Sequence, residues 1–178
     1  MPARFPKLFE FELKVTFLLW LILVAVYDVR MRRVPNWLVL AGAVLAFGAL
    51  ALGTGPLGHD WRAALLGAGA GFGFLLLFYA TGLMGAGDVK FAGALGLWVG
   101  VSAPAPIWII ASLMASAHSV LWLSLKRWPF FPRLALLLAG PSRASEPDVP
   151  TRRVRIIPYA AYLALAAAVW MVWGRQSS

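Results

Sequence analysis

Six apolar runs, separated by connections that carry most of the charged residues, constrain this chain more than any other feature. Apolar residues make up 61% of the 178 residues and charged residues 13%, against about 45–50% and about 25% in soluble domains. A helix needs about 20 mostly apolar residues to cross a bilayer, or fewer when flanking side chains reach the interface. The sequence therefore predicts an all-α integral membrane protein with about six transmembrane helices, which form one polytopic domain over residues 1–178. The fourth expected span begins just after Asp88 and ends near Gly100. The other five are about Val15–Tyr27, Pro35–Leu52, Ala63–Leu83, Ile107–Leu125 and Ile156–Trp173.

The first apolar run is short, with 13 residues from Val15 to Tyr27. We expect its helix to extend into the charged flanks at Lys14 or Arg30, which leaves Asp28 near one membrane boundary. A signal peptide is the alternative, because basic residues precede a short apolar core. No small-residue cleavage pattern follows that core, so the transmembrane helix is the favoured interpretation.

Lysine and arginine predict the orientation of the chain. With six spans, 11 of the 16 basic residues fall in the connections on one side of the membrane and five on the other. The richer side is expected to be cytoplasmic, with both termini outside, in the inner (plasma) membrane. The stretch 126–155 would be a cytoplasmic loop between spans five and six. This topology and anionic lipids explain the net charge of +9 better than nucleic acid does, because no nucleic-acid-binding motif is present.

Two acids, Asp28 and Asp88, adjoin the ends of spans on the predicted cytoplasmic side. An acid at such a position indicates function. Two carboxyls in a small space cannot both ionise and so share one proton, as in aspartic proteases. The structural alternatives are that Asp88 caps a helix and that Asp28 pairs with Arg30, Arg32 or Arg33.

Glycines surround the second acid. Gly85 and Gly87 remove side-chain bulk beside Asp88, so that the backbone can turn sharply or lie against an extended substrate. A merely tight connection is the simpler alternative. In span three, the glycine-rich segment Gly67–Phe74 predicts a close approach to another helix.

Three segments carry a resemblance to a known family. "GLMGAGDVK" (Gly82–Lys90) contains the Gly-x-Gly-Asp motif of intramembrane aspartyl proteases, and "YDVRMRRVPN" (Tyr27–Asn36) resembles the first aspartate region of type IV prepilin peptidases. "IPYAAYLALAAAV" (Ile157–Val169) is similar to the late Pro-Tyr-containing helix of that family. The resemblance extends from about Leu13 to Trp173.

The resemblance implies that Asp28 and Asp88 are a catalytic dyad that activates water without a metal or cofactor. The substrate would be a prepilin, whose short basic leader is removed at the cytoplasmic face, just before a hydrophobic helix. Membrane lipids are the other expected partner, and the oligomeric state stays open. Loop-shaping or structural roles are implied for Gly85, Gly87, Lys90, Val34, Pro35 and Asn36.

One departure from the family pattern concerns a second activity. Larger members carry paired Cys-x-x-Cys motifs in a cytoplasmic loop and also N-methylate the new amino terminus. This chain contains no cysteine and no comparable insertion between spans one and two. It resembles the short, peptidase-only type, for which methyltransferase activity is not expected.

Two other functions would use the same acids. A non-catalytic membrane scaffold could pair them with loop arginines. A proton or cation transporter could use them for conduction, although such proteins often show repeated halves or helices broken in mid-membrane. The sequence shows neither feature clearly, and its acids lie near one face.

The remaining polar and aromatic residues predict structural roles. His59 is expected to be a solvated loop residue, and His118 to bond to a neighbouring helix rather than to bind a metal. Several tryptophans lie near predicted boundaries, as an aromatic belt requires; the residues considered are Trp20, Trp37, Trp61, Trp98, Trp128 and Trp173.

Overall fold

The computed structural model describes residues 7–54, 56–127 and 158–173. These residues form six α-helices and one short 3₁₀ helix, so the all-helical prediction is confirmed. The elements are α1 (Lys7–Met31), α2 (Asn36–Ala51), η1 (Pro56–Gly58), α3 (Trp61–Ala80), α4 (Ala86–Val99), α5 (Pro104–Arg127) and α7 (Tyr159–Trp173). The predicted loop 126–155 begins inside the end of α5, and from residue 128 it lies outside the described residues.

Several helix boundaries differ from the sequence prediction. The extension of the first span is confirmed, because α1 runs from Lys7 to Met31. The predicted start of span four after Asp88 was wrong: α4 begins at Ala86 and contains that acid. The expected spans left residues 101–106 as a connection, but α5 begins within it at Pro104, since proline is tolerated in the first turn of a helix. Pro35, the expected first residue of span two, is the N-cap residue that precedes α2.

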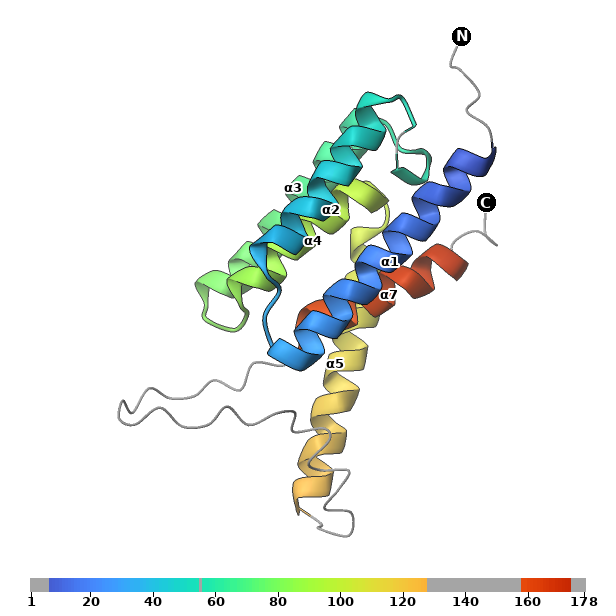
Figure 1. The fold of residues 1–178 in the computed structure, drawn as a ribbon. Helices are drawn as coiled ribbons and strands as arrows, with labels where there is room; N and C mark the ends of the chain where they lie inside the picture. The colour runs from blue at the N-terminus through green and yellow to red at the C-terminus, as the bar shows by residue number, and fades with distance from the viewer. Residues whose placement is uncertain (1–6, 55, 128–157, 174–178) are drawn as a thin grey trace.

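The helices form two groups (Figure 1). Helices α2, α3 and α4 lie side by side, while α1 packs against α7 and α7 against α5. The C-terminal part of α5 projects past the other described helices. Helix α4 is central: it contacts α2, α3 and α7 and buries ten of its 14 residues.

Glycines bring α3 and α4 close together. A Cβ atom at Gly96 on α4 would collide with the backbone of Gly67 on α3, and one at Gly71 would collide with the carbonyl oxygen of Ala92. The predicted role of the glycine-rich segment is therefore confirmed. Only the glycines at every fourth position face α4, because one helical turn separates them.

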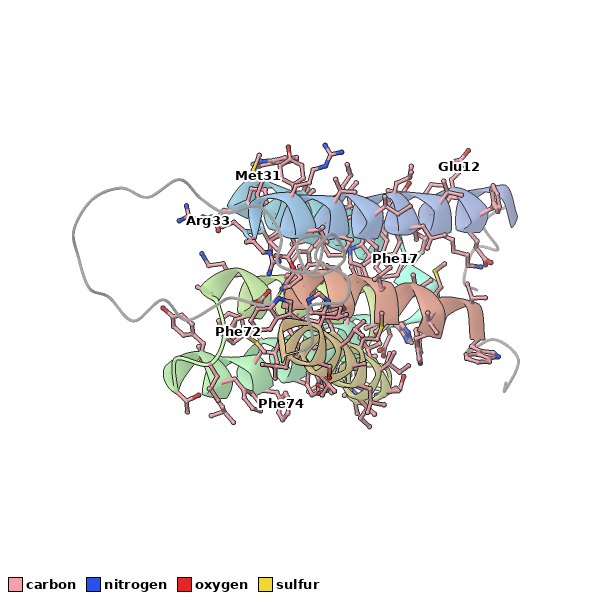
Figure 2. The ribbon with its side chains drawn as sticks, turned by 90° about the horizontal axis from the view of Figure 1, so that it is seen from below. Glu12, Phe17, Met31, Arg33, Phe72 and Phe74 are labelled. Carbon is pink, nitrogen blue, oxygen red and sulfur yellow. The ribbon has the colours of Figure 1, made fainter. Side chains whose placement is uncertain are left out.

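A cluster of aromatic rings fills the interior between α1, α2 and α4. Phe17 points from α1 into the interior (Figure 2) and stacks on Trp98, with ring centroids 4.9 Å apart. The indole N–H of Trp20 donates to the carbonyl of Leu38 (2.8 Å), and that of Trp98 donates to the carbonyl of Gly42 (2.9 Å). These bonds satisfy polar groups that no water reaches.

The aromatic-belt prediction holds for some tryptophans and fails for others. Trp20 and Trp98 are buried in the core, so a boundary position was wrong for both. Trp37, Trp61 and Trp173 are exposed at helix ends, as a belt requires. Trp128 lies outside the described residues.

The surface of the described residues fits a helical membrane protein. Residues Trp61–Ala80 and Pro104–Leu125 are long and apolar enough to cross a membrane, and α2 and α7 are shorter apolar helices. Large apolar side chains are exposed on five of the six α-helices, α4 being the exception. A helix that is apolar all round is suited to lipid or to a protein core. Examples of the exposed residues are Leu19, Leu40, Leu66, Leu77, Ile109, Leu113 and Val172.

His59 departs from its prediction as a solvated residue. It is half-buried, and its ring covers Gly100, whose φ of +69° closes α4; a Cβ atom there would lie 2.9 Å from the imidazole. Burial lowers the pKa of His59 below its ordinary value of 6.5, and the neighbouring Asp60 carboxylate opposes this.

Candidate active site

Asp28 lies in the last turn of α1. The helix ends just beyond it because Arg32 adopts a left-handed conformation (φ +52°) and returns its N–H to the carbonyl oxygen of Asp28 at 2.8 Å. Non-glycine residues adopt this conformation at a cost of about 1–2 kcal/mol. Asp28 as a whole is only 3% exposed, so its side chain lies within the protein.

Asp88 lies in the first turn of α4, where Gly85 is the N-cap residue. Its Oδ2 accepts a hydrogen bond from the N–H of Gly85 at 3.3 Å, so the capping role considered from the sequence is present. This contact uses one carboxylate oxygen and leaves Oδ1 for another partner. The side chain is 6% exposed.

The two carboxylates meet at the start of α7. The N–H of Ala160 donates to Oδ1 of Asp88 (3.1 Å), and the N–H of Ala161 donates to Oδ2 of Asp28 (2.8 Å). The donors are consecutive residues of one helical turn, so side chains 60 positions apart in the sequence are brought together. The prediction that Asp28 and Asp88 adjoin span ends on one side of the membrane agrees with this arrangement.

The start of α7 has no capping side chain of its own. Pro158 precedes the helix, whereas Ser, Thr, Asp or Asn usually accept the free N–H groups at this position. The aspartates of α1 and α4 take that role. Every buried side-chain nitrogen or oxygen in the described part of the chain has a hydrogen-bond partner.

The residues predicted to shape the site lie around the pair. Lys90 on α4 donates to the side-chain oxygen of Asn36 at the start of α2, with Nζ and Oδ1 3.1 Å apart. Gly87 faces Val34, and a Cβ atom there would lie 3.6 Å from its backbone. Gly85 has an extended conformation (φ −81°, ψ 148°), which any residue can adopt, so its backbone does not require glycine.

Helix α5 adds two contacts that fix α7. The hydroxyls of Ser112 on α5 and Tyr159 on α7 are hydrogen-bonded at 3.2 Å. His118 lies edge-on to Tyr162, with ring centroids 5.9 Å apart, so the contact with a neighbouring helix is ring packing where a bond was predicted. The resemblance included Tyr159 as part of a Pro-Tyr pair without giving it a role, and Tyr162 was not considered from the sequence.

The chemistry of this arrangement is that of paired acids beside a positive helix end. When two carboxyl groups are held on adjacent amides, it is more favourable for the pair to carry one negative charge than two, because like charges repel. One ionised carboxylate can accept a proton from water, while a protonated partner can polarise a carbonyl group. Among the described side chains, no three His, Cys, Asp or Glu residues are grouped so that they could hold a metal ion.

Comparison with known proteins identifies the family. A family model described as the type IV leader peptidase family matches residues 15–120, which include both aspartates. The chain belongs to the type IV leader peptidase family. The match ends before α7, so the helix that joins the two aspartates lies beyond it.

Two curated relatives bear the name "Prepilin leader peptidase/N-methyltransferase". The chain is 35% identical to the one from Bacillus subtilis (strain 168) over 117 residues, which are 65% of this chain and 46% of that protein. It is 33% identical to the one from Xanthomonas campestris pv. campestris over 122 residues, which are 65% of this chain and 34% of that protein. The chain therefore spans less than half the length of either relative. No solved structure matches it.

Proposed function

We propose that this leader peptidase family member is a membrane aspartyl endopeptidase that removes the leader of a prepilin. Asp28 and Asp88 activate a water molecule for attack on the scissile peptide, and no metal or cofactor takes part. The observation that carries the proposal is that the two buried carboxylates are held by consecutive amides of α7. The names of the two relatives support the class of substrate.

The proposed topology places the reaction at the cytoplasmic face. Six spans put both aspartates on the side that carries 11 of the 16 basic residues. A prepilin would insert its hydrophobic helix beside the enzyme and present its basic leader at this boundary. The methyltransferase activity in the names of the relatives is not proposed for this chain.

Cleavage of a prepilin by purified protein in detergent or vesicles tests the function. We expect Asp28→Asn and Asp88→Asn each to lower the rate at least about a thousandfold. Asp60→Asn is the matched control, because Asp60 caps α3 through Ala63 and does not contact the pair. Full cleavage by either site variant would refute the catalytic dyad.

The same variants separate the alternative functions. A scaffold that pairs its acids only for assembly should tolerate the conservative Asn changes. A proton or cation transporter should give ion flux in vesicles that contain the protein and no prepilin. Neither result is expected of a peptidase.

A further inference from the structure

We propose that the backbone N–H groups of Ala160 and Ala161 are positioning groups of the catalytic pair. They hold the two carboxylates side by side at the first turn of α7 and stabilise the single negative charge that the pair carries. This inference rests on the proposed function. It assigns part of the catalytic apparatus to α7, which lies outside the family match at residues 15–120.

The start of α7 carries a partial positive charge. The N–H groups in the first turn of a helix have no partner within the helix, and the aligned peptide dipoles place about half a positive charge there. The free N–H group of Ala160 donates to Asp88, and that of Ala161 donates to Asp28. An anion at this position is stabilised without any side-chain cation, so either carboxylate can carry the charge while the other holds the proton.

Both residues that supply the amide donors are buried. Ala160 is fully buried and Ala161 is 2% exposed, so water cannot take the place of a lost amide donor. A hydrogen bond to an ionised group is stronger in such surroundings, and losing one partner leaves the other with an uncompensated desolvation cost. The geometry of the pair is therefore expected to depend on these two donors.

Contacts with α5 fix the position of the first turn of α7. Tyr159 immediately precedes the two donors, and its hydroxyl bonds Ser112 on α5 at 3.2 Å. One turn further along, Tyr162 packs edge-on against His118. These contacts hold the donors in place while α1 and α4 supply the acceptors.

Other charged or titratable groups also act on the pair. Arg32, which follows α1, interacts electrostatically with Asp28 and with Tyr162, and Tyr159 interacts with Asp88. Lys90, the cation of α4, is bonded to Asn36 instead. The amide donors are distinct from these groups because they cannot lose or gain a proton as the pH changes.

Proline substitution can delete each donor separately. Proline lacks the N–H and is tolerated in the first turn of a helix, where that N–H has no intrahelical acceptor. We expect Ala160→Pro and Ala161→Pro to lower kcat for prepilin cleavage about tenfold to a hundredfold with little change in KM. The acid side of the pH–rate profile should move about one pH unit higher, because the ionised pair has lost a donor.

Arg62→Pro is the matched control. Arg62 is the second residue of α3, as Ala160 is of α7, and it is exposed. This variant should retain both the rate and the pH profile of the wild type. A general effect of proline on helix starts would alter stability in all three variants and would leave the pH profile unchanged.

A stability cycle tests the contact even if a proline variant is inactive. Ala161→Pro should lower the melting temperature of the wild type by about 4–10 °C. In an Asp28→Ala background, which has no acceptor, the same change should lower it little further. An equal loss in both backgrounds would overturn the inference.

The two proposals fail in different ways. If Asp28→Asn and Asp88→Asn abolish cleavage while both proline variants match Arg62→Pro in rate and pH profile, the dyad stands and the role of α7 is refuted. If the Asn variants still cleave, the proposed function fails first.

Discussion

Lys90 on α4 donates a hydrogen bond to Asn36 on α2, across 54 positions of the sequence, with Nζ 3.1 Å from Oδ1. Both side chains are exposed, so water can replace either partner. We expect Asn36→Ala and Lys90→Met each to lower the free energy of unfolding by about 0.5–1 kcal/mol. A double-mutant cycle should return a coupling of similar size. A coupling of zero would show that the two residues act independently.

The glycines of α3 provide a second prediction. Gly67→Ala and Gly71→Ala should each destabilise the fold by about 1–3 kcal/mol, because the added methyl groups meet the backbone of α4. Gly69 and Gly73 have nothing within 4 Å of an added Cβ atom. Their alanine variants are the controls and should be neutral, or stabilised by up to about 1 kcal/mol. Thermal unfolding in detergent measures all four, and equal effects would contradict the observed packing.

His59 provides a prediction about pH. Because burial lowers its pKa in the folded protein, the unfolded chain binds this proton at higher pH than the folded protein does. Stability therefore rises with pH across this interval and is lost as the pH falls below about 6.5. Melting temperatures measured between about pH 5 and pH 8 should fall less steeply on the acid side for His59→Gln than for the wild type. Identical pH slopes in the two proteins would exclude this contribution.

The absence of cysteine makes the proposed topology directly testable. Leu52 and Leu83 are exposed, in the connections after α2 and α3 respectively. In intact cells, Leu52→Cys should react with a membrane-impermeant thiol reagent, whereas Leu83→Cys should react only after the membrane is opened. The reverse pattern would invert the orientation and place the aspartates outside. Labelling at both positions in intact cells would contradict a membrane between them.

The two aspartates could be placed together from the sequence because topology restricts them to one end of the helices. The spacing of Gly67 and Gly71 likewise predicted a close helix pair, since glycines one turn apart share a face. Both inferences depend on patterns that can be recognised in the sequence without knowing how the side chains pack.

The role of α7 could not be predicted in the same way. Its donors are backbone N–H groups of two alanines, and every non-proline residue carries such a group. The only available signal was the start of the helix at Pro158 and Tyr159, where no side chain could serve as a cap. That signal shows that acceptors are needed, but it does not show which residues supply them.

Trp20 and Trp98 were predicted at membrane boundaries but lie in the core. The sequence indicates how long a span is, but not which helices pack against it. A tryptophan at a span boundary suits the interface, and the same residue suits the core when a carbonyl oxygen accepts its N–H. Leu38 and Gly42, one turn apart on α2, supply the two acceptors. Only the packing of α1 and α4 against α2 decides between these locations.

The placement of the amide donors on α7 also has a consequence for biosynthesis. The ribosome makes α1 and α4, with both acids, well before residues 160 and 161 leave the exit tunnel. Until α7 docks, the nascent chain lacks the two amide donors that hold Asp28 and Asp88 side by side in the folded protein. The arrangement of the two acids would therefore be completed late in synthesis, only once the last described helix has been made.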